Sequence, residues 1–183
     1  DLSIFKPQSK TESKRFNIIA VSSPWYPAKG ELDIYKLRSI LSDEDFEIIM
    51  VGLSANQMKK LPVGIRGIQR TQNVTELAKL YSDSDVLINP TYADTFPTVN
   101  LEALACGTPV ITYRTGGSPE AVDEKTGIVV EQGNVGALAE AIRTIKGHPL
   151  SSEACRKRAE EHFNKDKCLE KYIELYDSLI NKE

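Results

Sequence analysis

Six short apolar segments, most of them followed by a helical stretch, constrain the fold of this chain more than any other feature. The segments are rich in β-branched residues and are bounded by Gly, Pro, Ser or Asn, as buried strands are. They cover residues 18–21, 46–51, 63–68, 85–89, 110–113 and 127–130. Short buried strands that alternate with helices favour a parallel sheet covered on both faces. The sequence therefore predicts an α/β protein with a doubly wound, Rossmann-like parallel sheet.

Helices are predicted between these segments and after the last of them. Their signals are apolar residues at three- and four-residue spacing, the caps Asn73 and Asn134, and a Pro start with a Gly stop around 97–106. The predicted helices span residues 31–41, 74–81, 97–106, 135–145, 152–163 and 166–180. Residues 1–15 are polar and are predicted to be a linker, so the folded domain is expected to cover residues 16–183.

Composition narrows the class of protein. A length of 183 residues fits one domain, since domains average roughly 150 residues. No apolar run approaches the roughly 20 residues that a membrane span needs, and a net charge of −3 gives no general attraction to nucleic acid. Three cysteines without metal-ligand spacing favour a reducing, cytoplasmic setting. The first residues lack the apolar core of a signal peptide, and a chain that starts with Asp is expected to be part of a longer protein.

Ligands of such folds bind outside the carboxyl ends of the strands, and residues 89–120 carry the densest signal there. The predicted helix 97–106 is apolar on almost every side, which is typical of a buried helix. Glu102 lies in its middle, where an unpaired carboxylate would cost on the order of several kcal/mol. Either protein donors or the hydroxyls of a ligand must therefore face this side chain.

The start of the same helix predicts an anion site. The amides of its first turn, near residues 96–99, lack partners within the helix, and the helix dipole adds partial positive charge. Asp94 lies eight positions before Glu102, in the same loop region. A helix end that binds an anion, flanked by two carboxylates that accept hydroxyl hydrogen bonds, suits a phosphate joined to a sugar.

Three neighbouring motifs resemble those of one enzyme family. The chain reads Asp94-Thr-Phe-Pro, then Glu102-Ala-Leu-Ala-Cys-Gly-Thr-Pro-Val110, then Gly116-Gly-Ser-Pro-Glu120. This combination resembles the donor-binding half of GT-B glycosyltransferases, specifically retaining enzymes of family 4, which pair two acidic residues eight positions apart. The resemblance covers about residues 17–145, and residues 2–7 are similar to the linker between the two domains of that family.

The resemblance implies a role for each matching residue. Glu102 would bind the ribose hydroxyls of the donor, Asp94 would contact the transferred sugar, and Lys29 would neutralise the departing diphosphate, a form of electrostatic catalysis. The amides of residues 95–98 would cradle the diphosphate, and the loop 70–74 would touch the base. The donor-binding residues assigned in this way are Arg70, Thr71, Val74, Thr95, Phe96, Pro97, Thr98 and Glu102.

Two positions depart from the family pattern. The first acid is Asp94 where the family usually has Glu, so its contact with the sugar changes. The common Gly-Arg-Leu after the first strand is replaced by Ser22-Ser-Pro-Trp25, which removes a phosphate-binding arginine. Arg70 and Arg114 are the two candidates to replace it.

The resemblance also implies an overall function. A full enzyme of this bacterial type would transfer a sugar from a UDP- or GDP-sugar to a polysaccharide or lipid-linked acceptor, without a metal or other cofactor. It would be cytoplasmic, or peripheral on the inner face of the plasma membrane. Only the second domain would be present here, so the last helices would pack toward the absent first domain and the fragment alone would transfer no sugar. Two alternatives remain: a non-catalytic nucleotide-sugar-binding or scaffold domain, and a nucleotide-sugar 2-epimerase of the same architecture.

Overall fold

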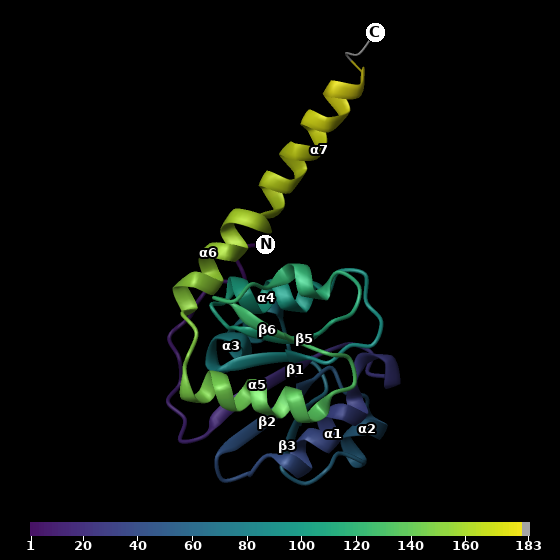
Figure 1. Ribbon diagram of the computed structural model, residues 1–183, viewed down its shortest axis with the longest axis vertical. Coiled ribbons are helices and arrows are strands. Elements are labelled where there is room, and N and C mark those ends of the chain that lie inside the picture. The colour runs from purple at the N-terminus through teal and green to yellow at the C-terminus, as the bar shows by residue number, and fades with distance from the viewer. Residues whose placement is uncertain (181–183) are drawn as a thin grey trace.

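A six-stranded, all-parallel sheet forms the centre of the molecule (Figure 1). The computed structural model describes residues 1–180. The strands are β1 (Phe16–Val21), β2 (Phe46–Val51), β3 (Ile65–Ile68), β4 (Val86–Asn89), β5 (Val110–Tyr113) and β6 (Gly127–Val130). Their order in the sheet is β3-β2-β1-β4-β5-β6. The predicted fold class, a doubly wound parallel α/β sheet, is confirmed.

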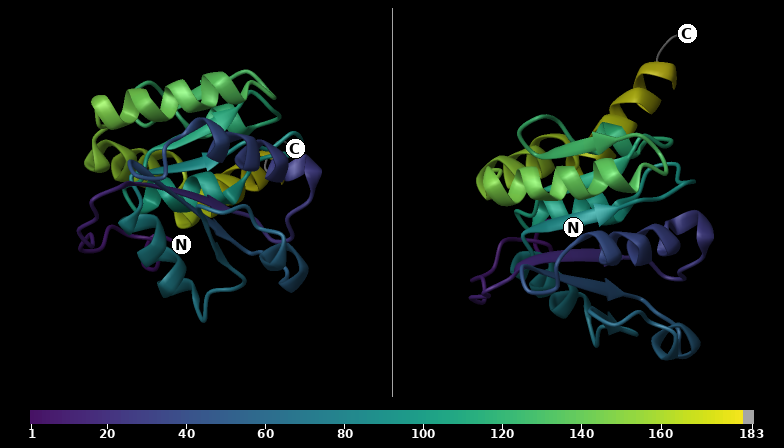
Figure 2. Two further views of the ribbon diagram at one scale, coloured as in Figure 1. Left: turned by 90° about the horizontal axis from the view of Figure 1, so that it is seen from below. Right: turned by 60° about the horizontal axis from the view of Figure 1, so that its bottom comes forward.

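Helices cover both faces of the sheet, as the apolar character of the strands requires. On one face lie α1 (Glu31–Ile40) and α5 (Val135–Gly147), whose buried side chains share a core with alternate residues of the strands. On the other face α3 (Val74–Asp83), α4 (Thr98–Ala105) and α6 (Ser152–His162) enclose a second core. Figure 2 shows these layers from two further directions. The sheet is therefore buried on both sides.

The order of the strands reverses between β1 and β4. The chain builds outward from β1 to β2 and β3, and then returns to place β4 against the other side of β1. Loops that leave the carboxyl ends of β1 and β4 consequently run in opposite directions. A crevice at this point is the usual ligand site of doubly wound sheets, so the fold itself selects one place to examine.

The predicted elements are all present, with their ends shifted by a few residues. The side chains of Asn73 and Asn134 cap α3 and α5 as expected, by accepting hydrogen bonds from the amides of Glu76 and Ala137. The helix α2 (Ala55–Lys59) and the two short 3-10 turns η1 (Pro27–Lys29) and η2 (Ser118–Ala121) were not predicted. None of the helices in residues 1–180 combines the length and the apolar character that crossing a bilayer requires.

The last helix, α7 (Lys165–Ile180), extends away from the body of the domain (Figures 1 and 2). None of its residues is buried. Its larger apolar side chains recur at three- and four-residue spacing, and each is more than half exposed. They are Leu169, Tyr172, Ile173, Leu175, Tyr176, Leu179 and Ile180. The expected packing of this helix toward another domain stays a prediction.

The predicted linker lies along the domain surface and is held there by polar contacts. The guanidinium of Arg156 donates to the carbonyl of Phe5 at 2.7 Å, and the amide of Thr11 donates to Asp83 Oδ1, also at 2.7 Å. Arg156 also bonds the carbonyl of Ala105 at the end of α4. The segment before β1 is thus attached to the ends of α3 and α4.

Candidate functional site

A cavity of about 280 Å³ lies where the strand order reverses. The carboxyl ends of β1 and β4 form its floor through Val21 and Asn89. Its walls are residues 22–23 after β1, Lys29 from η1, and the segment from Asp94 to the first turn of α4. Five of the predicted site residues line this one cavity. They are Lys29, Asp94, Phe96, Pro97 and Thr98.

The two charged side chains of the cavity form an ion pair. Lys29 Nζ lies 2.6 Å from Asp94 Oδ2, and the two side chains are 23% and 18% exposed. Because both keep some contact with water, the pair adds little to stability. Its importance is that it places one positive and one negative charge within reach of a small ligand.

Backbone contacts hold the segments that carry Lys29 and Asp94 against each other. The carbonyl of Ala28 accepts hydrogen bonds from the amide of Tyr92 at 2.7 Å and from the hydroxyl of Thr91 at 3.2 Å. Gly30 has a φ of +78°, and a Cβ there would lie 2.1 Å from the carbonyl oxygen of Pro90. Only glycine allows this approach, which explains the Lys-Gly pair in the sequence.

Helix α4 begins in the cavity without a side-chain cap. Its N-cap residue is Pro97, and no side chain accepts a hydrogen bond from its first amides. By contrast α2, α3, α5 and α6 are capped by Ser or Asn side chains. Helix α1 also lacks such a cap; its N-cap is Gly30, the residue after Lys29. Uncapped amides at the positive end of the helix dipole make this end of α4 suitable for an anion.

The glycine turn after β5 packs against the backbone of the site loop. Gly117 donates its amide to the carbonyl of Thr95 at 2.8 Å, and a Cβ on Gly116 would lie 1.9 Å from the carbonyl oxygen of Asp94. Gly116 also has a φ of +49°. The Gly-Gly pair therefore fixes the position of residues 94–95, which is a packing role that its place in the sequence did not reveal.

A buried polar network beneath α4 was also missed by sequence reasoning. Asn89 Nδ2 donates to Asn100 Oδ1 at 2.9 Å, and Asn100 Nδ2 donates to Ser118 Oγ at 3.1 Å. The hydroxyl of Thr112 bonds Ser118 Oγ at 2.6 Å and the carbonyl of Asn89 at 3.0 Å. These bonds connect α4 to β4, β5 and η2. A polar Asn100 within an apolar helix was the one signal available in the sequence.

Glu102 lies outside the cavity, one helical turn beyond Thr98, and is only half-buried. Its Oε2 accepts a hydrogen bond from the hydroxyl of the fully buried Tyr81 at 3.0 Å. Burial raises the pKa of the Glu102 carboxyl, and the Tyr81 hydrogen bond partly offsets that rise. A protein donor that sequence reasoning did not name thus supplies part of the bonding that this carboxylate needs.

The predicted burial of this helix holds for one side only. Thr98 is exposed, and Val99, Leu101 and Glu102 are half-buried. The reason is that α4 lies between α3 and α6 on one face of the sheet, and the side of the helix turned away from that core is open to solvent. The exposed stripe contains both Thr98 and Glu102, so a ligand at the start of the helix would reach along it.

The remaining predicted residues do not line the cavity. Arg70 is exposed after β3, Thr71 is half-buried, and Val74 begins α3 with 51% of its surface exposed. Thr95 is exposed and contributes its carbonyl to Gly117. Among the described residues that line the cavity, Lys29 is the single cation.

Arg114, one candidate to replace the absent family arginine, points elsewhere. Its Nε lies 2.8 Å from Glu131 Oε1, and both side chains are more than half exposed. Arg114 follows β5 and does not line the cavity. Within residues 1–180, no group of three or more His, Cys, Asp or Glu side chains is placed to hold a metal ion. Independence from metals stays a prediction.

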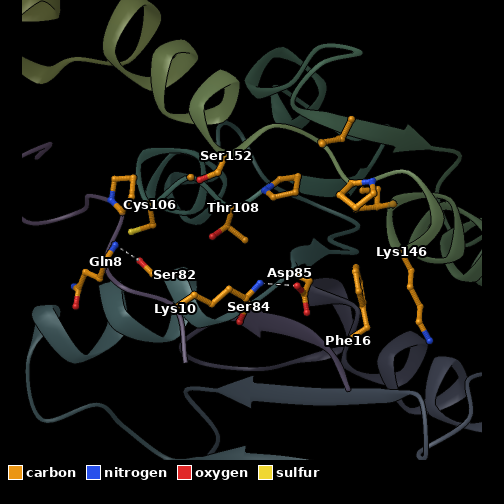
Figure 3. Close-up of a pocket in the computed structure, with 16 residues that line it drawn as sticks. Gln8, Lys10, Phe16, Ser82, Ser84, Asp85, Cys106, Thr108, Lys146 and Ser152 are labelled. Carbon is orange, nitrogen blue, oxygen red and sulfur yellow. Dashed lines mark hydrogen bonds and ion pairs between the residues drawn. The ribbon is translucent and has the colours of Figure 1, made fainter. Parts of the chain in front are cut away.

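A larger cavity, of about 440 Å³, lies beside the amino ends of β1, β4 and β5 (Figure 3). We call this side of the sheet the amino edge, and the side with the smaller cavity, where the strands end, the carboxyl edge. Two of its hydroxyls are bonded within the protein: Ser84 Oγ donates to the carbonyl of Leu80 at 2.7 Å, and Thr108 Oγ1 donates to the carbonyl of Tyr81 at 2.7 Å. Lys10 and Asp85 pair at 2.5 Å across it. Burial raises the pKa of the Cys106 thiol to about 12, so this thiol is not a nucleophile at neutral pH. The smaller cavity is therefore the candidate site.

The fold and the position of the cavity define the class of protein as a doubly wound domain of the kind found in GT-B glycosyltransferases. Sucrose-phosphate synthase from Thermosynechococcus elongatus superimposes on the whole chain with a TM-score of 0.85 at 22% identity, and the match covers 51% of that chain. A glycosyltransferase from Rickettsia africae gives 0.79 at 25% identity, over 94% of this chain and 50% of its own. Anabaena Alr3699/HepE, solved in complex with UDP-glucose, gives 0.77 at 18% identity, over 90% and 49%.

The chain belongs to the family described as glycosyl transferases group 1, whose profile matches residues 15–147. Among curated proteins, it is 38% identical over 96 residues to the D-inositol 3-phosphate glycosyltransferase of Mycobacterium tuberculosis, a match over 48% of this chain and 20% of that protein. The enzyme of the same name from an Arthrobacter species is 36% identical over 80 residues, over 43% and 19%. The matches thus span about a fifth of the length of these relatives and about half that of the solved structures.

Proposed function

We propose that this chain is the C-terminal, donor-binding domain of a retaining, family 4 GT-B glycosyltransferase, and that it binds a nucleoside-diphosphate sugar between β1 and β4. The observation that carries the proposal is the Lys29–Asp94 pair beside the uncapped start of α4, at the point where the strand order reverses. A cation and helix amides suit the diphosphate, and a carboxylate suits sugar hydroxyls. The complex of the structural neighbour HepE with UDP-glucose supports this type of ligand.

The diphosphate is proposed to lie on the first turn of α4, with the amides of residues 95–98 and the ammonium of Lys29 around it. Pro97 has no amide, so the donors there are Thr95, Phe96 and Thr98. Negative charge grows on the diphosphate as the sugar leaves, and a fixed cation and a helix dipole stabilise that charge. Lys29 would exchange Asp94 for phosphate oxygens, and Asp94 would turn to the sugar hydroxyls.

The nucleoside is proposed to extend from there along the exposed stripe of α4. Glu102 lies one turn beyond Thr98 and keeps acceptor capacity beside its bond from Tyr81. It would accept the ribose hydroxyls. The loop 70–74 joins the outermost strand β3 to α3, the helix that packs against α4, and would contact the base through Arg70, Thr71 and Val74.

The whole enzyme is proposed to close a cleft between this domain and another of similar size, since the solved relatives are about twice as long as this chain. The apolar stripe of α7 would pack on that domain. Transfer would proceed with retention of anomeric configuration, without a metal, to a polysaccharide or lipid-linked acceptor, on the cytoplasmic side of the membrane. The isolated chain would bind the donor and transfer no sugar. Sugar transfer by this chain alone would contradict the proposal that a second domain is required.

Calorimetric titration with UDP, GDP and UDP-glucose tests the proposal on the chain itself. Lys29→Ala is expected to weaken UDP binding about tenfold or more, because a charge-assisted bond is lost. The matched control is Lys146→Ala, which removes an exposed cation at the opposite edge of the sheet and is expected to leave affinity unchanged. The proposal would be contradicted if none of the three ligands bound, or if the two variants had equal effects on UDP affinity.

A further inference from the structure

A buried carboxylate next to the proposed site takes no part in the roles described so far. Asp33 is 2% exposed and lies in the first turn of α1. Its Oδ2 accepts hydrogen bonds from the hydroxyls of Tyr92 at 2.6 Å and Tyr113 at 2.8 Å. Its Oδ1 receives Lys36 Nζ at 3.2 Å, and that lysine side chain is 67% exposed. Two tyrosines from different elements thus share one oxygen atom.

The two tyrosines occupy different kinds of position. Tyr113 ends β5, inside the sheet, and is fully buried. Tyr92 lies in the loop between β4 and α4, two residues before Asp94, and is 39% exposed. Their rings meet edge to face with centroids 5.7 Å apart. Tyr113 therefore provides a rigid surface, against which Tyr92 and its loop are placed.

Asp33 joins the two segments that carry the ion pair. It follows Lys29 by four residues, and its partner Tyr92 precedes Asp94 by two. The main-chain bond from Tyr92 to Ala28 lies between these two points. Rotation of either segment would break the Tyr92–Asp33 bond and leave a buried carboxylate with one donor fewer, which carries a substantial free-energy cost.

We infer that Asp33 is a positioning residue that, through Tyr92, sets the distance between Lys29 and Asp94 and so the affinity for the nucleotide diphosphate. This inference rests on the proposed function, because the diphosphate is what the two charges would receive. Asp33 itself does not line the cavity and would touch no ligand. Small misplacements of charged groups in such sites have large effects, so the hydroxyl of a single tyrosine is expected to matter.

The shared oxygen provides a matched pair of variants. Tyr92→Phe and Tyr113→Phe each remove one hydroxyl bond to Asp33 Oδ2, and only Tyr92 lies on the Asp94 loop. We expect Tyr92→Phe to weaken UDP binding about tenfold, from the loss of a bond to a charged acceptor. We expect Tyr113→Phe to lower the melting temperature by as much or more and to change UDP affinity less than about twofold, since its bond fixes the sheet side only.

A conservative variant supplies the rescue test. Because both hydroxyls bond the same oxygen, the carbonyl oxygen of Asp33→Asn can still accept both, whereas Asp33→Ala can accept neither. We expect UDP affinity to fall in the alanine variant and to recover most of the way in the asparagine variant. Equal losses in these two variants, or equal effects of the two tyrosine variants on UDP affinity, overturn the inference.

A measurement without any ligand separates failure of this inference from failure of the proposed function. The amide of residue 92 donates to Ala28, so its hydrogen exchange reports whether the two segments stay together. We expect exchange at this amide to accelerate in Tyr92→Phe and Asp33→Ala and to stay near the parent rate in Tyr113→Phe. If the parent chain binds no UDP, the proposed function fails, and exchange at residue 92 still decides whether Asp33 holds the segments. Unchanged exchange in Tyr92→Phe overturns the inference whether or not UDP binds.

Discussion

The two cavities at opposite edges of the sheet differ in how their polar groups are satisfied. At the amino edge, in the larger cavity, the hydroxyls of Ser84 and Thr108 and the carboxylate of Asp85 all bond to the protein, and the ends of α3 and α4 carry capped carbonyls. At the carboxyl edge, in the smaller cavity, α4 starts without a side-chain cap, and within residues 1–180 the Lys29 ammonium is paired with Asp94 alone. Volume alone would select the amino edge. Unused hydrogen-bonding capacity selects the edge that the fold also selects.

The difference follows from the direction of the strands and helices. In a parallel sheet every strand delivers its carboxyl end, and every following helix its positive amino end, to the same edge. The amino edge receives the negative ends of α3 and α4, where the chain already supplies Lys10, and the start of α6, which Ser151 caps. Binding of anions is therefore expected at the uncapped start of α4, at the carboxyl edge. Glycine and carboxylate variants at the two edges test this difference.

The largest effect is expected from the glycines. Gly116→Ala places a Cβ 1.9 Å from the carbonyl oxygen of Asp94, and Gly107→Ala places one 2.1 Å from Ser152 Oγ at the amino edge. Both residues have positive φ, so we expect each variant to lose about 2–4 kcal/mol of unfolding free energy. Denaturant unfolding measures this loss. Only Gly116→Ala should also abolish UDP binding in the fraction that remains folded.

A helical glycine is the control for both substitutions. Gly147 ends α5 with nothing within 4 Å of a Cβ, so Gly147→Ala should leave stability and binding nearly unchanged. If Gly107→Ala reduced UDP affinity as much as Gly116→Ala, the assignment of the ligand to the carboxyl edge would be wrong.

A smaller effect is expected from Asp94→Asn, which should raise the affinity for UDP. The substitution removes the carboxylate that competes with phosphate for Lys29, and we expect UDP to bind about threefold to tenfold more tightly. The preference for UDP-glucose over UDP should shrink, because the acceptor for sugar hydroxyls is weaker. Calorimetry with both ligands measures the two changes.

Asp85→Asn is the counterpart at the amino edge. It releases Lys10 from an ion pair of 2.5 Å and should leave UDP affinity unaltered, since that lysine faces the other cavity. A decrease of UDP affinity in Asp94→Asn would show that the carboxylate helps to bind the diphosphate and does not compete with it.

The smallest effect concerns pH. Burial raises the pKa of Glu102, so its carboxylate is lost at a higher pH than that of an exposed glutamate. We expect UDP-glucose affinity to decline by a few-fold as pH falls from 7 toward 5, and Glu102→Gln to flatten that profile at lower affinity. A pH series of titrations measures both. An unchanged profile in Glu102→Gln would assign the dependence to another group.

The raised pKa of Glu102 also makes the stability of the folded chain depend on pH. Between the ordinary glutamate pKa of about 4.3 and the raised value in the folded chain, folding takes up protons, so stability falls as pH rises through this window. Ionised Glu102 therefore costs stability at neutral pH. Glu102→Gln, which still offers Tyr81 an acceptor oxygen, should melt at the same or a higher temperature at pH 7.

The fold could be predicted because its signals are local. Runs of β-branched residues, the caps Asn73 and Asn134, and the Pro97-to-Gly107 punctuation each act within a few residues. Helix α2 was missed although Ser54 and Gln57 form a capping box, because five residues are too few to show helical periodicity. Element type was readable wherever the segment was long enough.

The site was predictable only in part, because its geometry depends on pairs that are distant in sequence. Lys29 and Asp94 could each be proposed from local motifs, but their ion pair joins positions 65 residues apart. The support of Asp33 by Tyr113 spans 80 residues, and the bond from Tyr81 to Glu102 spans 21. Nothing near these residues in the sequence identifies such partners, so positioning residues emerge from the structure alone.

The self-neutralised charge pair in the small cavity has a consequence for selectivity. Inorganic phosphate that binds Lys29 breaks the ion pair with Asp94 and leaves that carboxylate without its counter-ion. Its net gain in binding free energy is therefore small. A molecule that carries a phosphate and, a few bonds away, hydroxyl groups gives a new partner to both Lys29 and Asp94. The protein would thereby distinguish a conjugate from either of its fragments, and common cellular anions would compete only weakly for the same place.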